Sequence, residues 1–233
     1  MSMKPFNQNT PRLELIAGYE YEKRAIEIAL IGNHPIVFLI NKGSEIPSLL
    51  MTANRIALEQ QIRFKGLVYF WCPCGNYGSL KDECQCKYPV IERHLRKLAK
   101  VVSKYDIWSQ SQSYPRQYHL GEVEEEFVGR VKRAIKFREE QVSDNAIRFN
   151  SSSPLKLLTD SSVGLLKDYQ QKVSIRVDVP KVVQLAITIA LADYVYDFNY
   201  ALCRPLIHQH HLATALQYQP YTMAGMQGIL NER

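Results

Sequence analysis

Five consecutive apolar residues, Ile36–Ile40, constrain the fold more than any other segment of this 233-residue chain. Pro35 precedes them, and the polar loop Asn41–Pro47 follows. A short apolar run between turn residues is typical of a strand covered on both faces of a parallel sheet. A second run, Gly66–Trp71, predicts another buried strand, and the weak alternation of Asp106–Tyr114 suggests a third.

Helical patterns lie between and after these strands. Glu20–Ile31 and Ser48–Ile62 carry apolar residues at helical spacing, and Gly32-Asn33 is expected to end the first helix. After about residue 118 only helical patterns occur, and segment 179–196 is apolar on nearly every side. The pattern predicts an α/β fold in which a small sheet flanked by helices is followed by an all-helical bundle.

Composition agrees with an ordinary globular protein, because 46% of the residues are hydrophobic and 22% are charged. No run of about 18 apolar residues is present, and the first twelve residues lack the apolar core of a secretory signal. We therefore expect a cytoplasmic protein with no membrane partner. The formal net charge of +6 is compatible with nucleic acid as a partner.

Four of the five cysteines occur in one loop, 72–86, as two C-x-C pairs: Cys72, Cys74, Cys84 and Cys86. Four thiols can surround a tetrahedral Zn²⁺, and Gly75 and Gly78 would let the backbone bring the pairs together. Structural zinc sites usually separate paired cysteines by two or more residues, so packed reduced thiols and redox chemistry stay open as alternatives. His94 is a further candidate ligand, although a place on a helix surface also explains it.

A basic helix is predicted directly after this loop, over Tyr88–Lys104. With Tyr77 and Tyr88 nearby, its cations form a candidate nucleic-acid face. A solvated helix face beside core aromatic residues explains the same pattern. The cations are Lys87, Arg93, Arg96, Lys97, Lys100 and Lys104.

Several short motifs occur in a fixed order along the chain. They are CPCG at Cys72–Gly75, CQC at Cys84–Cys86, SIRV at Ser174–Val177, AITIALAD at Ala186–Asp193 and HLATALQY at His211–Tyr218. GYEYEKRAIEIALIGNH at Gly18–His34 precedes them. Together these segments resemble the magnesium-chelatase-like AAA+ ATPases of the ComM/YifB type. The resemblance covers residues from about 13 to 220. It implies a reduced AAA+-like α/β core within residues 1–118 and a helical, lid-like domain within 119–233.

The AAA+ sheet has the strand order 5-1-4-3-2, and the resemblance implies that strands 2 and 3 are missing here. The three remaining strands would then be neighbours, with Ile36–Ile40 in the centre. Gly66–Trp71 would become an apolar edge, and we expect the chain to associate with a partner through it.

The family's nucleotide loop falls on Ile40–Pro47, where Lys42, Gly43 and Ser44 keep only part of its chemistry. Ile46 stands where a lysine would reach the phosphates. Pro47 stands where a hydroxyl would bind Mg²⁺, and it has no N–H to donate. The acidic Walker-B strand has no counterpart, and Arg176 matches the family's sensor-2 arginine as a relic.

The resemblance therefore implies a non-catalytic AAA+-like protein, a pseudo-ATPase that binds neither ATP nor Mg²⁺. It would act as a binding, scaffolding or regulatory subunit, with another copy of itself or an active AAA+ homologue as its partner. A nucleic-acid-binding module related to the DNA-processing motors of this family is the main alternative. An active ATPase with unorthodox phosphate binding is the alternative that Ile46 and Pro47 oppose most strongly.

Overall fold

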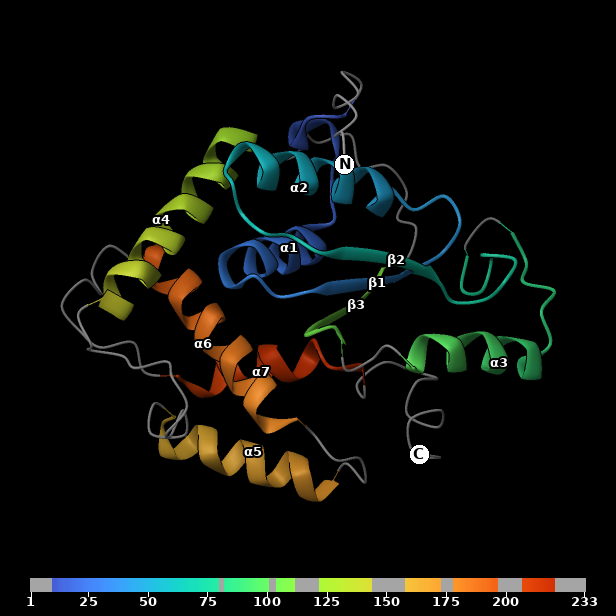
Figure 1. Cartoon of the computed structure of the whole chain (residues 1–233). Coiled ribbons are helices and arrows are strands. Elements are labelled where there is room, and N and C mark those ends of the chain that lie inside the picture. The colour runs from blue at the N-terminus through green and yellow to red at the C-terminus, as the bar shows by residue number, and fades with distance from the viewer. Residues whose placement is uncertain are drawn as a thin grey trace.

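The computed structural model describes residues 10–79, 82–100, 104–111, 122–143, 158–172, 178–196 and 207–220. In these residues three parallel strands form one sheet in the order β2-β1-β3 (Figure 1). The strands are β1 (Ile36–Ile40), β2 (Gly66–Phe70) and β3 (Ile107–Ser111). The three predicted strands and the central place of β1 are confirmed.

The central strand β1 and the edge strand β2 differ in their exposure to solvent. All five residues of β1 are buried, as the apolar run predicts, because β1 has a strand on either side and helices on both faces. The prediction that β2 is equally buried is wrong. Gly66 and Phe70 are exposed and the residues between them are half-buried, because β2 forms an edge of the sheet.

Helices cover both faces of the sheet (Figure 1). The alternating side chains of β1 divide between two apolar clusters. Ile36, Phe38 and Ile40 belong to the cluster that includes α1 (Glu20–Gly32) and α2 (Ile46–Glu59). Val37 and Leu39 pack on the other face, with apolar side chains of α3 (Tyr88–Ala99).

The rest of the described chain is helical: α4 (Glu124–Ser143), α5 (Asp160–Lys172), α6 (Val179–Tyr196) and α7 (Gln209–Gln217). The helix α6 packs against α1, α4 and α7. Its residues from Leu185 to Ala192 are all buried, so the prediction that the apolar segment 179–196 is the central helix is confirmed.

Polar contacts connect the helical part to the sheet. The Nε2 atom of His34, just before β1, lies 2.8 Å from Thr188 Oγ1 on α6, and its Nδ1 atom lies 3.2 Å from Asp106 Oδ2. Lys181 on α6 forms an ion pair of 3.0 Å with the other oxygen of Asp106. These contacts join the two regions, and the division of the chain at residue 118 stays a prediction.

The observed helix ends refine the predicted ones. The helix α1 ends at Gly32 and is capped by Asn33, which has a positive φ of 56°, in agreement with the stop predicted at Gly32-Asn33. The helix α2 begins two residues earlier than predicted because Pro47 fits the first turn of a helix. Among the described residues, each helix is too short or too polar to span a lipid bilayer.

Candidate metal centre

The cysteine loop follows β2 and bends at two glycines. Gly75 and Gly78 have φ angles of +79° and +73°, a left-handed conformation that side chains disfavour. The Gly75 amide donates a hydrogen bond of 3.0 Å to the Cys72 carbonyl, which closes the first turn. The role predicted for the two glycines is confirmed, because these bends turn the chain back toward the first cysteine pair.

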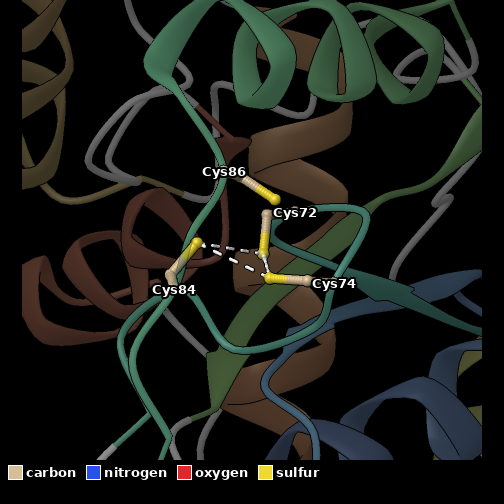
Figure 2. Close-up of side chains that lie close together, drawn as sticks. All are labelled: Cys72, Cys74, Cys84 and Cys86. Atoms are coloured by element: carbon tan, nitrogen blue, oxygen red, sulfur yellow. Dashed lines mark hydrogen bonds between the residues drawn. The ribbon is translucent and has the colours of Figure 1, made fainter.

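The loop brings the four predicted cysteines together (Figure 2). The Cys72 Sγ atom lies 3.2 Å from that of Cys74 and 3.6 Å from that of Cys84, and the Cys74 and Cys84 sulfurs are 3.6 Å apart. All four sulfurs, including that of Cys86, lie within 4.8 Å of one another. A Zn–S bond of about 2.3 Å places the sulfurs of a tetrahedral site about 3.8 Å apart, so the cluster has the size of a zinc site.

Main-chain amides face two of the sulfurs. The Asn76 amide donates to Cys74 Sγ at 3.5 Å, and the Tyr77 amide donates to Cys72 Sγ at 3.3 Å. Such donors stabilise thiolates and orient metal ligands. Two of the four sulfurs therefore accept main-chain hydrogen bonds.

The thiols differ strongly in acidity. The Asn76 amide, followed by the Cys72 thiol, lowers the pKa of Cys74 to about 6. Burial raises the pKa of Cys84 to about 12. The cluster therefore forms one thiolate readily, whereas several thiolates together require a cation to offset their mutual repulsion.

His94 does not belong to the ligand set. Its Nε2 atom donates a hydrogen bond of 2.9 Å to the Phe70 carbonyl, and its ring stacks on Tyr69 with the ring centres 4.6 Å apart. The nitrogen that faces Phe70 therefore carries a hydrogen rather than a free lone pair.

The five residues of the predicted degenerate nucleotide loop lie in the turn between β1 and α2 and in the first two positions of α2, and several of their amides have internal partners. The Lys42 amide donates to the Gly75 carbonyl at 2.7 Å, which joins this turn to the cysteine loop. The Glu45 amide donates to the Tyr19 hydroxyl at 3.2 Å, and the Ile46 amide lies 3.3 Å from Ser44 Oγ. Ile46 is fully buried, and Gly43 and Pro47 are exposed.

A second link between the turn and the cysteine loop could not be read from the sequence. The buried Asn41 side chain donates to the Gly78 carbonyl at 2.8 Å. An asparagine that directly follows a buried strand is a weak signal for such a contact. The cysteine loop and the β1–α2 turn therefore form one hydrogen-bonded unit.

All six predicted cations are exposed, from Lys87 to Lys104. The prediction that one helix contains them is wrong at its end, because α3 stops at Ala99. Apolar residues of α3, among them Ile91 and Leu95, face the sheet, so the cations occupy the remaining surface of the helix. Arg96 forms an ion pair with Glu92, one turn away on the same helix.

A second cluster, Asp193, His210 and His211, has the size of a metal site but other partners. The Nδ1 atom of His211 accepts a hydrogen bond of 3.1 Å from the His208 amide, which caps α7. Its Nε2 atom must then carry the hydrogen, and it lies 3.5 Å from Asp193 Oδ2. Asp193 also forms an ion pair with Arg24, so the cluster already serves as a helix cap and an ion pair.

Arg176, the residue that matches the sensor-2 arginine, and the fifth cysteine, Cys203, lie outside the described residues. No protein-family model matches the chain, and a search of curated proteins finds no match either.

Proposed function

We propose that this chain is a non-catalytic relative of the magnesium-chelatase-like AAA+ ATPases that acts as a binding, scaffolding or regulatory subunit. The turn between β1 and α2 is the observation that supports this proposal most directly. A phosphate-binding loop presents free main-chain amides, a lysine and a hydroxyl to the nucleotide. Here the Lys42, Glu45 and Ile46 amides have internal acceptors.

The side chains at the same turn also oppose phosphate binding. The buried, uncharged Ile46 side chain would replace the phosphate-binding lysine, and Pro47 would replace the Mg²⁺-binding hydroxyl. The Glu45 carboxylate would stand near the incoming phosphates and repel them. The turn would instead support the cysteine loop, since Lys42 and Asn41 donate to that loop.

A titration with a fluorescent ATP analogue and Mg²⁺ tests this proposal. We expect no saturable binding up to about 1 mM nucleotide and no release of phosphate by wild-type protein, with an intact P-loop ATPase as the positive control. The Tyr19→Phe variant removes the acceptor of the Glu45 amide, and it should still fail to bind because the lysine and the hydroxyl are absent. Binding or turnover by the wild-type protein would contradict the proposal.

We also infer that the four-cysteine cluster holds one structural Zn²⁺. The proposal rests on four sulfurs within 4.8 Å of one another and on the amide donors to Cys72 and Cys74. Four protein ligands leave no open position for a substrate, which is typical of a structural site rather than a catalytic one. A cytosolic location agrees with this inference, because thiols stay reduced there.

Nucleic-acid binding is a second candidate function, favoured by the exposed cations on α3 and beside its two ends. Tyr88 at the start of this helix is 67% exposed, and Tyr77 in the cysteine loop is also exposed, so both rings are accessible for stacking on bases. Fluorescence anisotropy with a labelled 20-nucleotide single strand at several salt concentrations would measure binding and its salt dependence. Changing Arg93 and Lys100 to Gln should weaken the binding.

A matched control for that experiment changes Lys132 and Lys136 to Gln. Both residues are exposed and lie on α4 rather than on α3. Each double variant removes two positive charges, so the change in net charge is the same. Equal losses of affinity in the two double variants would indicate nonspecific attraction and would contradict a specific face on α3. Native mass spectrometry would report self-association, and co-purification with an active AAA+ homologue would test the heteromeric alternative.

A further inference from the structure

The main-chain groups on the outer side of β2 can be assigned from its pairing with β1. The Ile36 amide donates to the Lys65 carbonyl at 2.9 Å, and the Trp71 amide donates to the Ile40 carbonyl at 3.3 Å. In a parallel ladder alternate residues bond to the same neighbour, so the odd-numbered residues of this strand face β1. The amides and carbonyls of Gly66, Val68 and Phe70 consequently point away from the sheet.

One end of this outer side is already closed. His94 donates to the Phe70 carbonyl at 2.9 Å, and the Tyr69 hydroxyl donates to the His94 carbonyl at 3.1 Å. Among the described residues, no main-chain group pairs with Val68 or Gly66 on this side. The open part of the edge is therefore the segment Gly66–Val68 together with the Phe70 amide.

The open segment is accessible to a partner. Phe70 is 41% exposed, Gly66 is exposed and Val68 is half-buried. An unpaired apolar edge of this kind is a template for another strand, and native proteins usually protect it by pairing or by charge. Both faces of β2 are packed against helices, so the edge is the direction from which a partner can approach.

The charge around the edge is positive. Residues 60–71 contain Arg63 and Lys65 and no acidic residue. The helix α3 runs back along the sheet against the direction of β2 (Figure 1). Lys97 comes one turn after His94, whose imidazole contacts the Phe70 carbonyl at the end of the strand. Arg63 and Lys97 are exposed, and the one acidic residue of α3, Glu92, is paired with Arg96. Two copies of this edge would bring like charges together, which disfavours self-pairing.

We propose that the outer edge of β2 binds an extended acidic segment of a partner protein as an added strand. The main chain of that segment pairs with Val68, and its carboxylates meet Arg63 and Lys97. This inference rests on the proposed binding role and names the chemistry of the partner; it does not depend on zinc or on the loss of ATPase activity. An outward ladder of amides and carbonyls fits a peptide backbone, whereas nucleic acid would use the cations alone.

Selection from a random nonapeptide phage library, with the whole chain as bait, provides the probe. We expect sequences rich in Glu, Asp and β-branched residues to be enriched. The enriched peptide is then synthesised in two forms of equal charge, one normal and one N-methylated at alternate residues. The normal form should bind at least about tenfold more tightly, because main-chain pairing needs its N–H groups.

Variants of the edge sharpen the test. Val68→Pro removes an amide that β1 does not use, and it should weaken binding about tenfold or more, whereas Val68→Thr keeps the amide and should bind like wild type. Lys97→Glu should weaken binding and reduce its salt dependence. If Val68→Pro fails to fold by circular dichroism, the N-methylated peptide and Lys97→Glu decide the question.

Three results would overturn the proposal: no enrichment, equal binding of the N-methylated peptide, or equal binding by a folded Val68→Pro variant. The surface would instead be assigned to nucleic acid by the following result. Single-stranded DNA displaces the peptide, and its affinity falls with Lys97→Glu as much as that of the peptide does but is unchanged with Val68→Pro. Nucleotide turnover would contradict the proposed function while leaving the peptide result intact, so the two failures are distinguishable.

Discussion

Gly32 lies so close to His34 that a Cβ atom on Gly32 would stand 2.3 Å from the imidazole ring and 2.8 Å from Thr188 Oγ1. The imidazole in turn connects the start of β1 to α6. The missing side chain at position 32 is therefore part of the contact between the sheet and the helical region.

Gly32→Ala is expected to lower the free energy of unfolding by about 1–3 kcal/mol, because the new methyl group must displace the buried imidazole. Gly164→Ala is the matched control. Gly164 lies inside α5, and a methyl group added there would meet no atom within 4 Å, so its replacement should stabilise the protein by about 0.5–1 kcal/mol. Urea denaturation measures both values, and equal effects would contradict this account of Gly32.

Lys23→Met is expected to stabilise the protein. The Lys23 Nζ atom is buried, has no hydrogen-bond partner among the described residues, and lies among apolar side chains that include Ile26 and Phe127. Replacing this amine by an apolar side chain of similar length should raise the free energy of unfolding by about 1–3 kcal/mol near pH 7.

The same variant tests a pH dependence. Burial lowers the pKa of Lys23 in the folded chain, whereas an unfolded lysine keeps a pKa of about 10.4. Between these two values the unfolded chain binds more protons, so this lysine makes stability rise with pH. The difference in stability between Lys23→Met and wild type should therefore shrink as the pH approaches 10, and a constant difference would contradict the prediction.

His211 should reduce stability in mild acid. Burial lowers its pKa to about 4 in the folded chain, below the ordinary histidine value of 6.5. The unfolded chain binds the extra proton between pH 6.5 and 4, so acidification through this window weakens folding by up to about 3 kcal/mol. His211→Gln removes the titration and keeps a side chain suited to the third position of a capping box. Its stability should fall less steeply with acid, and an unchanged slope would rule out His211 as the cause.

Purified protein should contain one zinc ion per chain by native mass spectrometry. When the free zinc concentration is about a hundred times the dissociation constant, removal of the ion should lower the melting temperature by roughly 5–10 °C. Cys84→Ser should lose both the ion and this chelator-sensitive stability. Cys203→Ser is the control for removing a thiol outside the 72–86 loop, and equal zinc loss in the two variants would contradict the assignment.

Much of the fold could be predicted because the informative patterns are local. The apolar run Ile36–Ile40 requires burial on both faces, and it is the central strand. The apolar segment 179–196 has no polar face to expose, and it forms the central helix α6. The exposure of Gly66–Phe70 was harder to predict from the run itself, because an edge strand packed on both faces is also apolar.

The spacing of the four cysteines predicts that their sulfurs form one cluster, but it does not predict which groups surround that cluster. The donors to Cys72 and Cys74 are backbone amides, and residue type does not reveal their direction. Arg24 and Asp193 are 169 residues apart and form an ion pair that no local pattern indicates. The partners of the turn amides likewise depend on Tyr19, from another segment of the chain.

The central position of β1 has a consequence during synthesis. Its two neighbours follow it in the sequence, and the later one ends at Ser111, 71 residues after Ile40. At about 5–20 residues per second, roughly 4–14 seconds pass on the ribosome before both hydrogen-bonding sides of this strand can be filled. During that interval the nascent chain carries a fully apolar pentapeptide that is unpaired until β2 is made and paired on one side only until β3 follows. A chaperone would therefore protect it most before the third strand emerges.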